Sequence, residues 1–245
     1  DTDRFINGSR ISYWNTILGR SAGEDAIIHT NRPDEFFKDI EIALRLYRNI
    51  DNYELALYGY HGFWKSPGGY DSSMLQALFP DLNVYGASIR GVVGKGIGNA
   101  EIGYYDSADD TSGKNPLINN SEMRYLLGYT QEIGKDLTLG LQYYIEEMLD
   151  YCSYRDTANA RERYRHLTTV RLTKLLMNQN LQCSLFAYFS PTDRDVYLRP
   201  NVNYKVNDNT ALEAGGNIFF GDYPDTFFGQ FEDNTNIYLG YRYSF

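Results

Sequence analysis

The sequence ends in Asn236-Ile237-Tyr238-Leu239-Gly240-Tyr241-Arg242-Tyr243-Ser244-Phe245, ten residues that alternate between two kinds of side chain. Every odd-numbered position is apolar or aromatic, whereas the even-numbered positions include small, polar and charged residues such as Arg242. A period of two residues predicts a β-strand whose two faces meet different environments. Aromatic residues on one face and an arginine on the other suit a strand with lipid outside and water or polar groups inside.

Similar alternating segments recur along the whole chain. Within Lys38–Arg48, for example, leucine and isoleucine residues share one face, while Glu41 and Arg45 share the other. We predict about twelve strands of roughly 9–12 residues, the length that a tilted strand needs to cross a bilayer. Besides the last ten residues, the predicted strands are Arg10–Leu18, Lys38–Arg48, Tyr53–Trp64, Leu82–Val93, Asn99–Ser107, Glu122–Glu132, Leu137–Met148, Arg163–Lys174, Leu181–Ser190, Asp195–Val206 and Ala211–Gly221.

Short turns and mostly long loops alternate between these strands. The turn Asn49–Asn52, for instance, precedes a strand that is followed by the long connection Lys65–Asp81. An even number of strands with short turns at one end and long loops at the other is typical of single-chain bacterial barrels. Because the pattern continues throughout, we expect residues 1–245 to form a single domain.

A chain that stops at a C-terminal phenylalanine after such alternation resembles the porin-like β-barrel proteins of bacterial outer membranes. The resemblance implies an all-β fold: a transmembrane, antiparallel, up-and-down β-barrel with short periplasmic turns and long extracellular loops. It also implies that the last strand, with Tyr241, Tyr243 and Phe245 at the lipid interface, closes the barrel and is recognised by the barrel-assembly machinery. The expected location is therefore the outer membrane of a Gram-negative bacterium, in contact with membrane lipid and lipopolysaccharide.

Composition is consistent with this interpretation and narrows the possible partners. The net charge is −9 and the isoelectric point is about 4.8, which argues against nucleic acid as a partner. Mean hydropathy is −0.49, and no run approaches the roughly 20 apolar residues of a transmembrane helix. The first residues, Asp1-Thr2-Asp3-Arg4, show no signal peptide, so we expect that an export signal was removed or that further residues precede Asp1.

The polar faces of the predicted strands carry many charges, and each would cost a few kcal/mol in hydrocarbon. We therefore place these residues in the interior, where arginine recurs on strand after strand. The residues predicted to line the lumen are Arg45, Arg90, Glu101, Arg124, Gln142, Arg171, Arg199, Glu213 and Arg242. Other residues predicted on the same face are Glu41, Glu54, Glu122, Glu146, Arg163, Arg165, Asp195, Asn201, Asn203, Lys205 and Asn217.

Two explanations of this charged face compete. In the first, the chain is a channel for ion transport, a porin whose arginines attract small anionic or polar solutes. In the second, arginine and glutamate pair across the wall and seal a structural barrel whose extracellular loops bind a partner. A barrel of twelve strands lies between the eight-stranded size that side chains fill and the sixteen-stranded size that leaves a channel. We favour the porin.

A third possibility is a lipid hydrolase built on the same scaffold. His166 and Thr168 lie two residues apart on the predicted lipid face, which resembles the outward histidine and serine of twelve-stranded outer-membrane phospholipases. Here threonine replaces the serine, and no asparagine is placed beside it, so we expect no catalytic residues and no enzyme. His29, His61 and His166, with Cys152 and Cys183, show no metal-ligand spacing, and we expect neither metal nor cofactor.

Overall fold

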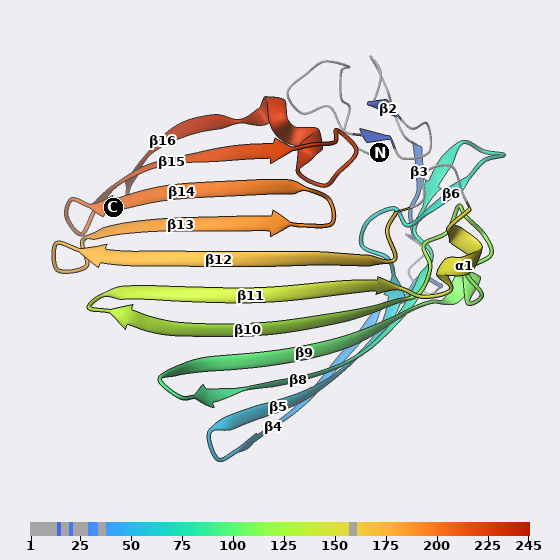
Figure 1. The fold of residues 1–245 in the computed structure, drawn as a ribbon, viewed down its shortest axis with the longest axis horizontal. Coiled ribbons are helices and arrows are strands. Elements are labelled where there is room, and N and C mark those ends of the chain that lie inside the picture. The colour runs from blue at the N-terminus through green and yellow to red at the C-terminus, as the bar shows by residue number, and fades with distance from the viewer. Residues whose placement is uncertain (1–13, 16–19, 22–28, 34–37, 157–160) are drawn as a thin grey trace.

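The computed structural model describes residues 14–15, 20–21, 29–33, 38–156 and 161–245. Its dominant element is an antiparallel sheet of eleven strands, in which strands are joined in chain order as a meander (Figure 1). The strands are β4 (Ile42–Ile50), β5 (Tyr53–Phe63), β8 (Asp81–Val93), β9 (Gly96–Ser107), β10 (Glu122–Gly134), β11 (Leu137–Met148), β12 (Tyr164–Leu176), β13 (Leu181–Ser190), β14 (Asp195–Lys205), β15 (Thr210–Gly221) and β16 (Asn236–Tyr243).

The prediction of an all-β, antiparallel, up-and-down fold is confirmed. Each strand of the large sheet corresponds to one of the predicted strands. The largest disagreement at a strand end is four residues, at the start of β4, which begins at Ile42 rather than Lys38. The period-two pattern therefore located the strands well, because each strand has one apolar face and one polar face.

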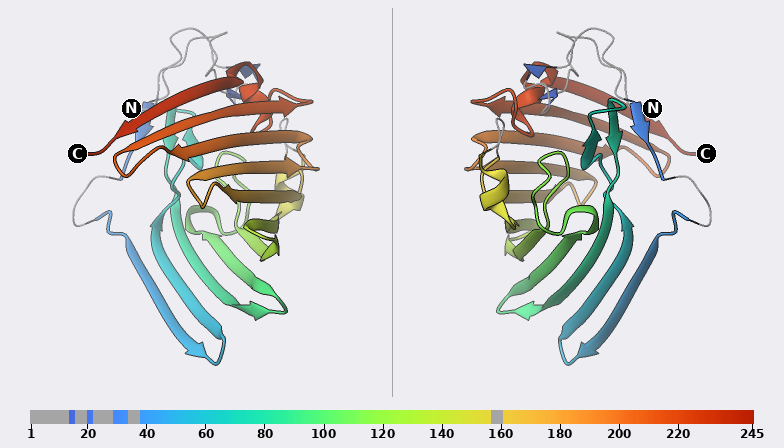
Figure 2. Two further views of the ribbon diagram at one scale, coloured as in Figure 1. Left: turned by 90° about the vertical axis from the view of Figure 1, so that its left-hand side faces the viewer. Right: turned by 90° about the vertical axis from the view of Figure 1, so that its right-hand side faces the viewer.

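The prediction of a closed barrel of about twelve strands is not what the structure shows, because the sheet is open. Among the described residues, β4 pairs only with β5, and β16 pairs only with β15. Figure 2 shows the curved sheet with β4 and β16 as its two edges. An alternating meander with an odd number of strands leaves its first and last strands running in the same direction, so β4 and β16 cannot pair antiparallel with each other.

Two predicted features depended on that closure. Of the strand predicted at Arg10–Leu18, only β1 (Trp14–Asn15) is described, and it pairs with β2 (Arg20–Ser21); the rest lies outside the described residues. The closing strand predicted from Tyr241, Tyr243 and Phe245 is β16, but this strand does not close the sheet. Phe245 lies beyond the end of β16 and is fully exposed.

The two ends of the sheet differ as the sequence predicts. At the turn end, short connections such as Asp51–Asn52 and Gly94–Lys95 join the strands. Asp51 and Gly94 adopt positive φ angles of 51° and 60°, which tight hairpin turns require. At the loop end the connections are longer, except for the short link 191–194 between β13 and β14.

The loop end carries its own small elements. β3 (His29–Asn31), β6 (Gly69–Asp71) and β7 (Gln76–Leu78) form a three-stranded sheet. Two short 3₁₀ helices, η1 (Ala108–Asp110) and η2 (Gly229–Asn234), and the single-turn helix α1 (Tyr151–Tyr154) lie in other loops. Within the part of the chain that is described, no helix has the length and apolar character needed to span a membrane.

The register of the large sheet separates two faces. Residues directly opposite each other on paired strands share a face, so Leu57, Ala87 and Ile102 lie in one row, which Tyr125 and Ile145 continue. We call this the outer face. It is apolar yet exposed: Leu57 and Leu127 are 61% exposed, and Ile237 is 91% exposed. The opposite, inner face carries Arg45, Arg124 and Arg165.

Glycine allows close approach at one strand end, and this provides a test of the register. A Cβ atom at Gly96 would overlap the carbonyl oxygen of Thr130 and approach the ring of Tyr129 to 2.8 Å. We expect Gly96→Ala to lower the free energy of unfolding by about 1–3 kcal/mol because of this overpacking. Gly59→Ala is the matched control, since nothing lies within 4 Å of its Cβ position, and it should be neutral or stabilising by up to about 1 kcal/mol. Urea unfolding of both variants measures the difference, and equal effects would contradict the register.

Candidate functional site

Charged side chains form a cross-strand row on the inner face near the loop end. Arg124 on β10 lies opposite Glu146 on β11, and Glu146 lies opposite Arg165 on β12. Such directly paired positions bring side chains of opposite charge within reach of each other. The row therefore alternates positive, negative and positive across three neighbouring strands.

Short ion pairs extend this row into a network. The Arg124 guanidinium donates to the Glu122 carboxylate at 2.7 Å and lies 4.0 Å from Glu146. Arg165 donates to Asp193 at 2.7 Å and lies 3.9 Å from Glu146. The side chain of Glu122 is only 3% exposed, so the Arg124 charge that lies against it offsets part of the cost of burying a carboxylate.

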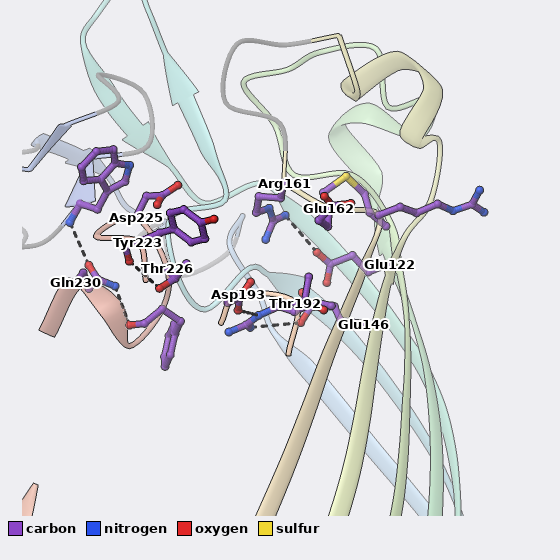
Figure 3. A pocket seen from close by; sticks show the side chains of 15 residues that line it. Glu122, Glu146, Arg161, Glu162, Thr192, Asp193, Tyr223, Asp225, Thr226 and Gln230 are labelled. Carbon is purple, nitrogen blue, oxygen red and sulfur yellow. Dashed lines mark hydrogen bonds and ion pairs between the residues drawn. The ribbon is translucent and has the colours of Figure 1, made fainter. Parts of the chain in front are cut away.

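A cavity of about 660 Å³ opens beside this network at the loop end (Figure 3). Its lining combines carboxylates, guanidinium groups and aromatic rings from six separate segments of the chain. The lining residues are Trp14, Glu122, Glu146, Met148, Arg161, Glu162, Arg163, Arg165, Thr192, Asp193, Tyr223, Asp225, Thr226, Phe227 and Gln230. A pocket of this size and mixed polarity can hold a small polar or charged solute.

The segment 222–235, which contains η2, folds onto the inner face and forms one side of the cavity. The ring of Phe228 lies 4.5 Å from that of Tyr188 and 5.0 Å from that of Tyr197, measured between centroids. The backbone N–H of Phe228 donates to the carboxylate of Asp195 at 2.7 Å, and Asp195 is fully buried. Aromatic packing and a buried hydrogen bond therefore hold this segment against the inner face of the sheet.

The arginines of the inner face fall into two groups. Arg45, Arg124 and Arg165 each have a carboxylate partner at 2.6–2.7 Å. Among the described residues, no carboxylate lies within 4 Å of the guanidinium groups of four other exposed arginines, which are Arg90, Arg171, Arg199 and Arg242.

Nearby carboxylates are already engaged elsewhere. Glu54 lies directly opposite Arg90 in the register, but its carboxylate accepts a hydrogen bond from Arg45 at 2.6 Å. Glu213 accepts hydrogen bonds from the Asn201 amide at 2.7 Å and from the Tyr238 hydroxyl at 3.3 Å. These contacts leave Arg90 without an ion pair to the carboxylate that lies opposite it.

The structure places all nine residues predicted to line the lumen on this one face. The register of the sheet shows this, because residues paired across adjacent strands share a face. It places five of the nine residues directly: Arg45, Arg124, Gln142, Arg199 and Arg242. The nine residues are spread over the sheet rather than gathered at one point. Arg90, Glu101, Arg171 and Glu213 complete the set.

Several contributors to the cavity were outside the predicted site. Asp193 and Phe227 lie in segments predicted to be connections, and no periodic signal marks a loop residue that folds back onto a sheet. The inward direction of Glu122, Glu146 and Arg165 was predicted from strand phase, but their joint network was not. Only the register, which fixes which residues lie opposite each other, could have indicated it.

The histidine considered for lipid hydrolysis has a different set of neighbours. His166 Nδ1 lies 2.7 Å from the Tyr143 hydroxyl, and its ring stacks between Tyr143 and Tyr164. Thr168 lies opposite Phe189 and Tyr143. Among the described residues, no cluster of three His, Cys, Asp or Glu side chains could hold a metal ion.

Comparison with known proteins adds no family to this picture. No protein-family model matches the sequence, and no curated protein matches it significantly. The interpretation of the site therefore depends on its own geometry and charge.

The ion network predicts a strong asymmetry between single and double substitutions. Arg124→Met leaves the buried Glu122 carboxylate without its shortest ion pair and should cost about 3–5 kcal/mol in the free energy of unfolding. The double variant Glu122→Gln/Arg124→Met removes both charges and should recover most of that loss. Arg194→Met is a control, because its pair with Asp222 is long at 3.9 Å and exposed. A double variant as unstable as the single variant would contradict the network.

Proposed function

We propose that this chain forms the wall of a porin-like channel in a bacterial outer membrane, and that the channel passes small anionic or polar solutes. The observation that carries the proposal is a group of inner-face arginines for which no described residue supplies a carboxylate within 4 Å: Arg90, Arg171, Arg199 and Arg242. Basic side chains that line a water-filled path attract anions and lower the barrier to their entry.

The outer face supports the membrane location. Large apolar side chains are exposed on strands from β4 to β16, among them Leu57, Leu127 and Ile237. Soluble monomers rarely expose apolar patches larger than a few hundred Å², because water contact with them is unfavourable. Lipid is the environment that suits a continuous apolar face on a sheet whose other face is charged.

A membrane location also requires that the sheet be closed. Unpaired backbone N–H and C=O groups at the edges of β4 and β16 would each cost several kcal/mol in hydrocarbon. Because these edge strands run in the same direction, antiparallel closure takes an odd number of further strands between them. One further strand would give the predicted total of twelve. In this arrangement the short turns are periplasmic and the long loops extracellular, next to lipopolysaccharide, and β16 is the strand that the assembly machinery recognises.

A sealed structural barrel is the second candidate, and one observation favours it. The segment 222–235 lies against the inner face through Phe228, and the network around Glu122, Arg124 and Arg165 is paired. Both features occupy the interior near the loop end. In this alternative the long loops bind a partner, and no solute passes. Neither candidate gives the chain an enzymatic role.

Conductance in a planar bilayer tests the channel directly. Refolded protein should give steady single-channel currents with an anion preference in reversal-potential measurements. Neutralising Arg171→Gln and Arg199→Gln together should lower the anion/cation permeability ratio roughly two- to tenfold, because two unpaired positive charges are lost. The matched control neutralises the pair Arg45→Gln and Glu54→Gln, which leaves the net charge unchanged and should preserve the ratio. Folded protein without conductance would favour the sealed barrel.

Two adjacent residues on β11 test the orientation of the faces. Leu141 is exposed on the outer face, and its neighbour Gln142 is exposed on the inner face. Leu141→Arg should cost about 2–4 kcal/mol of stability in lipid vesicles, whereas Gln142→Arg should cost little. The measurement is urea unfolding from vesicles. If water covered both faces, both substitutions would be tolerated equally, and that result would refute the membrane location.

A further inference from the structure

An arginine pair on the inner face encloses an aromatic ring in the middle of the sheet. Arg171 on β12 lies opposite Phe186 on β13, and Phe186 lies opposite Arg199 on β14. We infer that Arg171, Phe186 and Arg199 form a binding site for small aromatic carboxylates. The inference rests on the proposed channel, and it names the class of solute that pauses there.

The geometry of the three strands fixes the dimensions of this site. Neighbouring strands lie about 4.7–4.9 Å apart, so the two arginines are separated by twice that distance, with the phenylalanine between them. Side chains of this length can converge on a single carboxylate above the ring. Gly140 lies opposite Arg171 on the next strand, so no side chain fills that flank.

The charge of the site calls for an anion. Both guanidinium groups are exposed, and neither has a carboxylate within 4 Å among the described residues. The closest candidate for Arg199 is Glu213, whose Oε1 accepts hydrogen bonds from Asn201 and Tyr238 instead. An incoming carboxylate would therefore meet two exposed guanidinium groups. Arg199 lies beside the Tyr238 hydroxyl but, like Arg171, has no carboxylate within 4 Å among the described residues. Planar guanidinium groups of this kind bind carboxylates through paired hydrogen bonds.

The residues around the two arginines favour an anion that carries an aromatic ring. β13 is the only strand of the sheet without a charged residue, and its inner face presents Phe186 and Tyr188. The ring of Tyr197 meets that of Phe186 edge to face, with the centroids 6.5 Å apart. A ligand ring could add to this arrangement, and the flanking guanidinium groups could also stack on its face.

The other inner-face arginines that have no carboxylate within 4 Å among the described residues lack these features, which makes one of them a control. Arg242 is exposed on the same face, but it lies opposite Ala211 on β15 and has no aromatic residue at the paired position. Loss of Arg242 removes the same charge as loss of Arg171. A difference between the two variants therefore reports the site rather than the overall charge of the face.

Fluorine NMR of 4-fluorobenzoate with the refolded full chain in detergent micelles tests the site without requiring conductance. We expect saturable line broadening beyond that in empty micelles. Arg171→Gln/Arg199→Gln should weaken the affinity at least tenfold, and Phe186→Leu should weaken it several-fold. Phe186→Tyr, which keeps the ring, and Arg242→Gln should bind as the unchanged protein does. Heat-dependent gel mobility would verify that each variant is folded. If Phe186→Leu does not fold, the arginine variants and Phe186→Tyr still test the site.

Competition identifies the ligand chemistry. Benzoate should displace the probe, whereas acetate, glucuronate and benzyl alcohol should displace it only at much higher concentrations. Displacement by glucuronate or acetate at the benzoate concentration, or an equal effect of Arg242→Gln, would overturn the inference. Conductance without saturable probe binding would refute this site but not the channel. Saturable binding without conductance would refute the channel but not this site.

Discussion

The antiparallel register is the constraint on which the rest of this structure depends. Because side chains alternate strictly along a strand, a slip of one residue in any pairing would move that strand's arginines to the apolar face. The pairings from β4 to β16 keep the same phase across eleven strands, with a shift only between Glu132 and Gly134 at the turn end of β10. Separation of the two faces, the ion network and the exposed arginines all follow from that unbroken phase.

The sign of the charge on the inner face also follows the direction of the strand. Every strand that runs from the loop end to the turn end carries an arginine, and no strand that runs the other way contains arginine or lysine. The four return strands β5, β9, β11 and β15 carry a glutamate instead, at Glu54, Glu101, Glu146 and Glu213. Arginines on different strands are thus kept about two strand spacings apart, which limits their mutual repulsion. β13 departs from the rule and presents aromatic rings where the others present glutamate.

The sequence predicted what local periodicity controls. The strands, their facing and the inward position of Arg45, Arg171 and Arg199 could be derived because each depends on a residue and its near neighbours. Closure could not, because it depends on a pairing between distant strands and on whether their number is odd or even. Nor could the contact between Phe228 and Asp195, because a loop that folds onto a sheet has no period. Which arginines pair with a carboxylate could not be derived either. Glu54 lies opposite Arg90 in the register, yet its carboxylate accepts a hydrogen bond from Arg45.

The unpaired edges of the sheet affect how the chain behaves in water. β4 and β16 contain neither proline nor lysine, the residues with which proteins commonly protect exposed sheet edges from pairing with other molecules. Each edge is therefore a template for a strand from another chain, and β4 offers apolar leucines alongside it. In water, encounters between such edges would lead to aggregation. Pairing of each edge with another strand would remove this tendency.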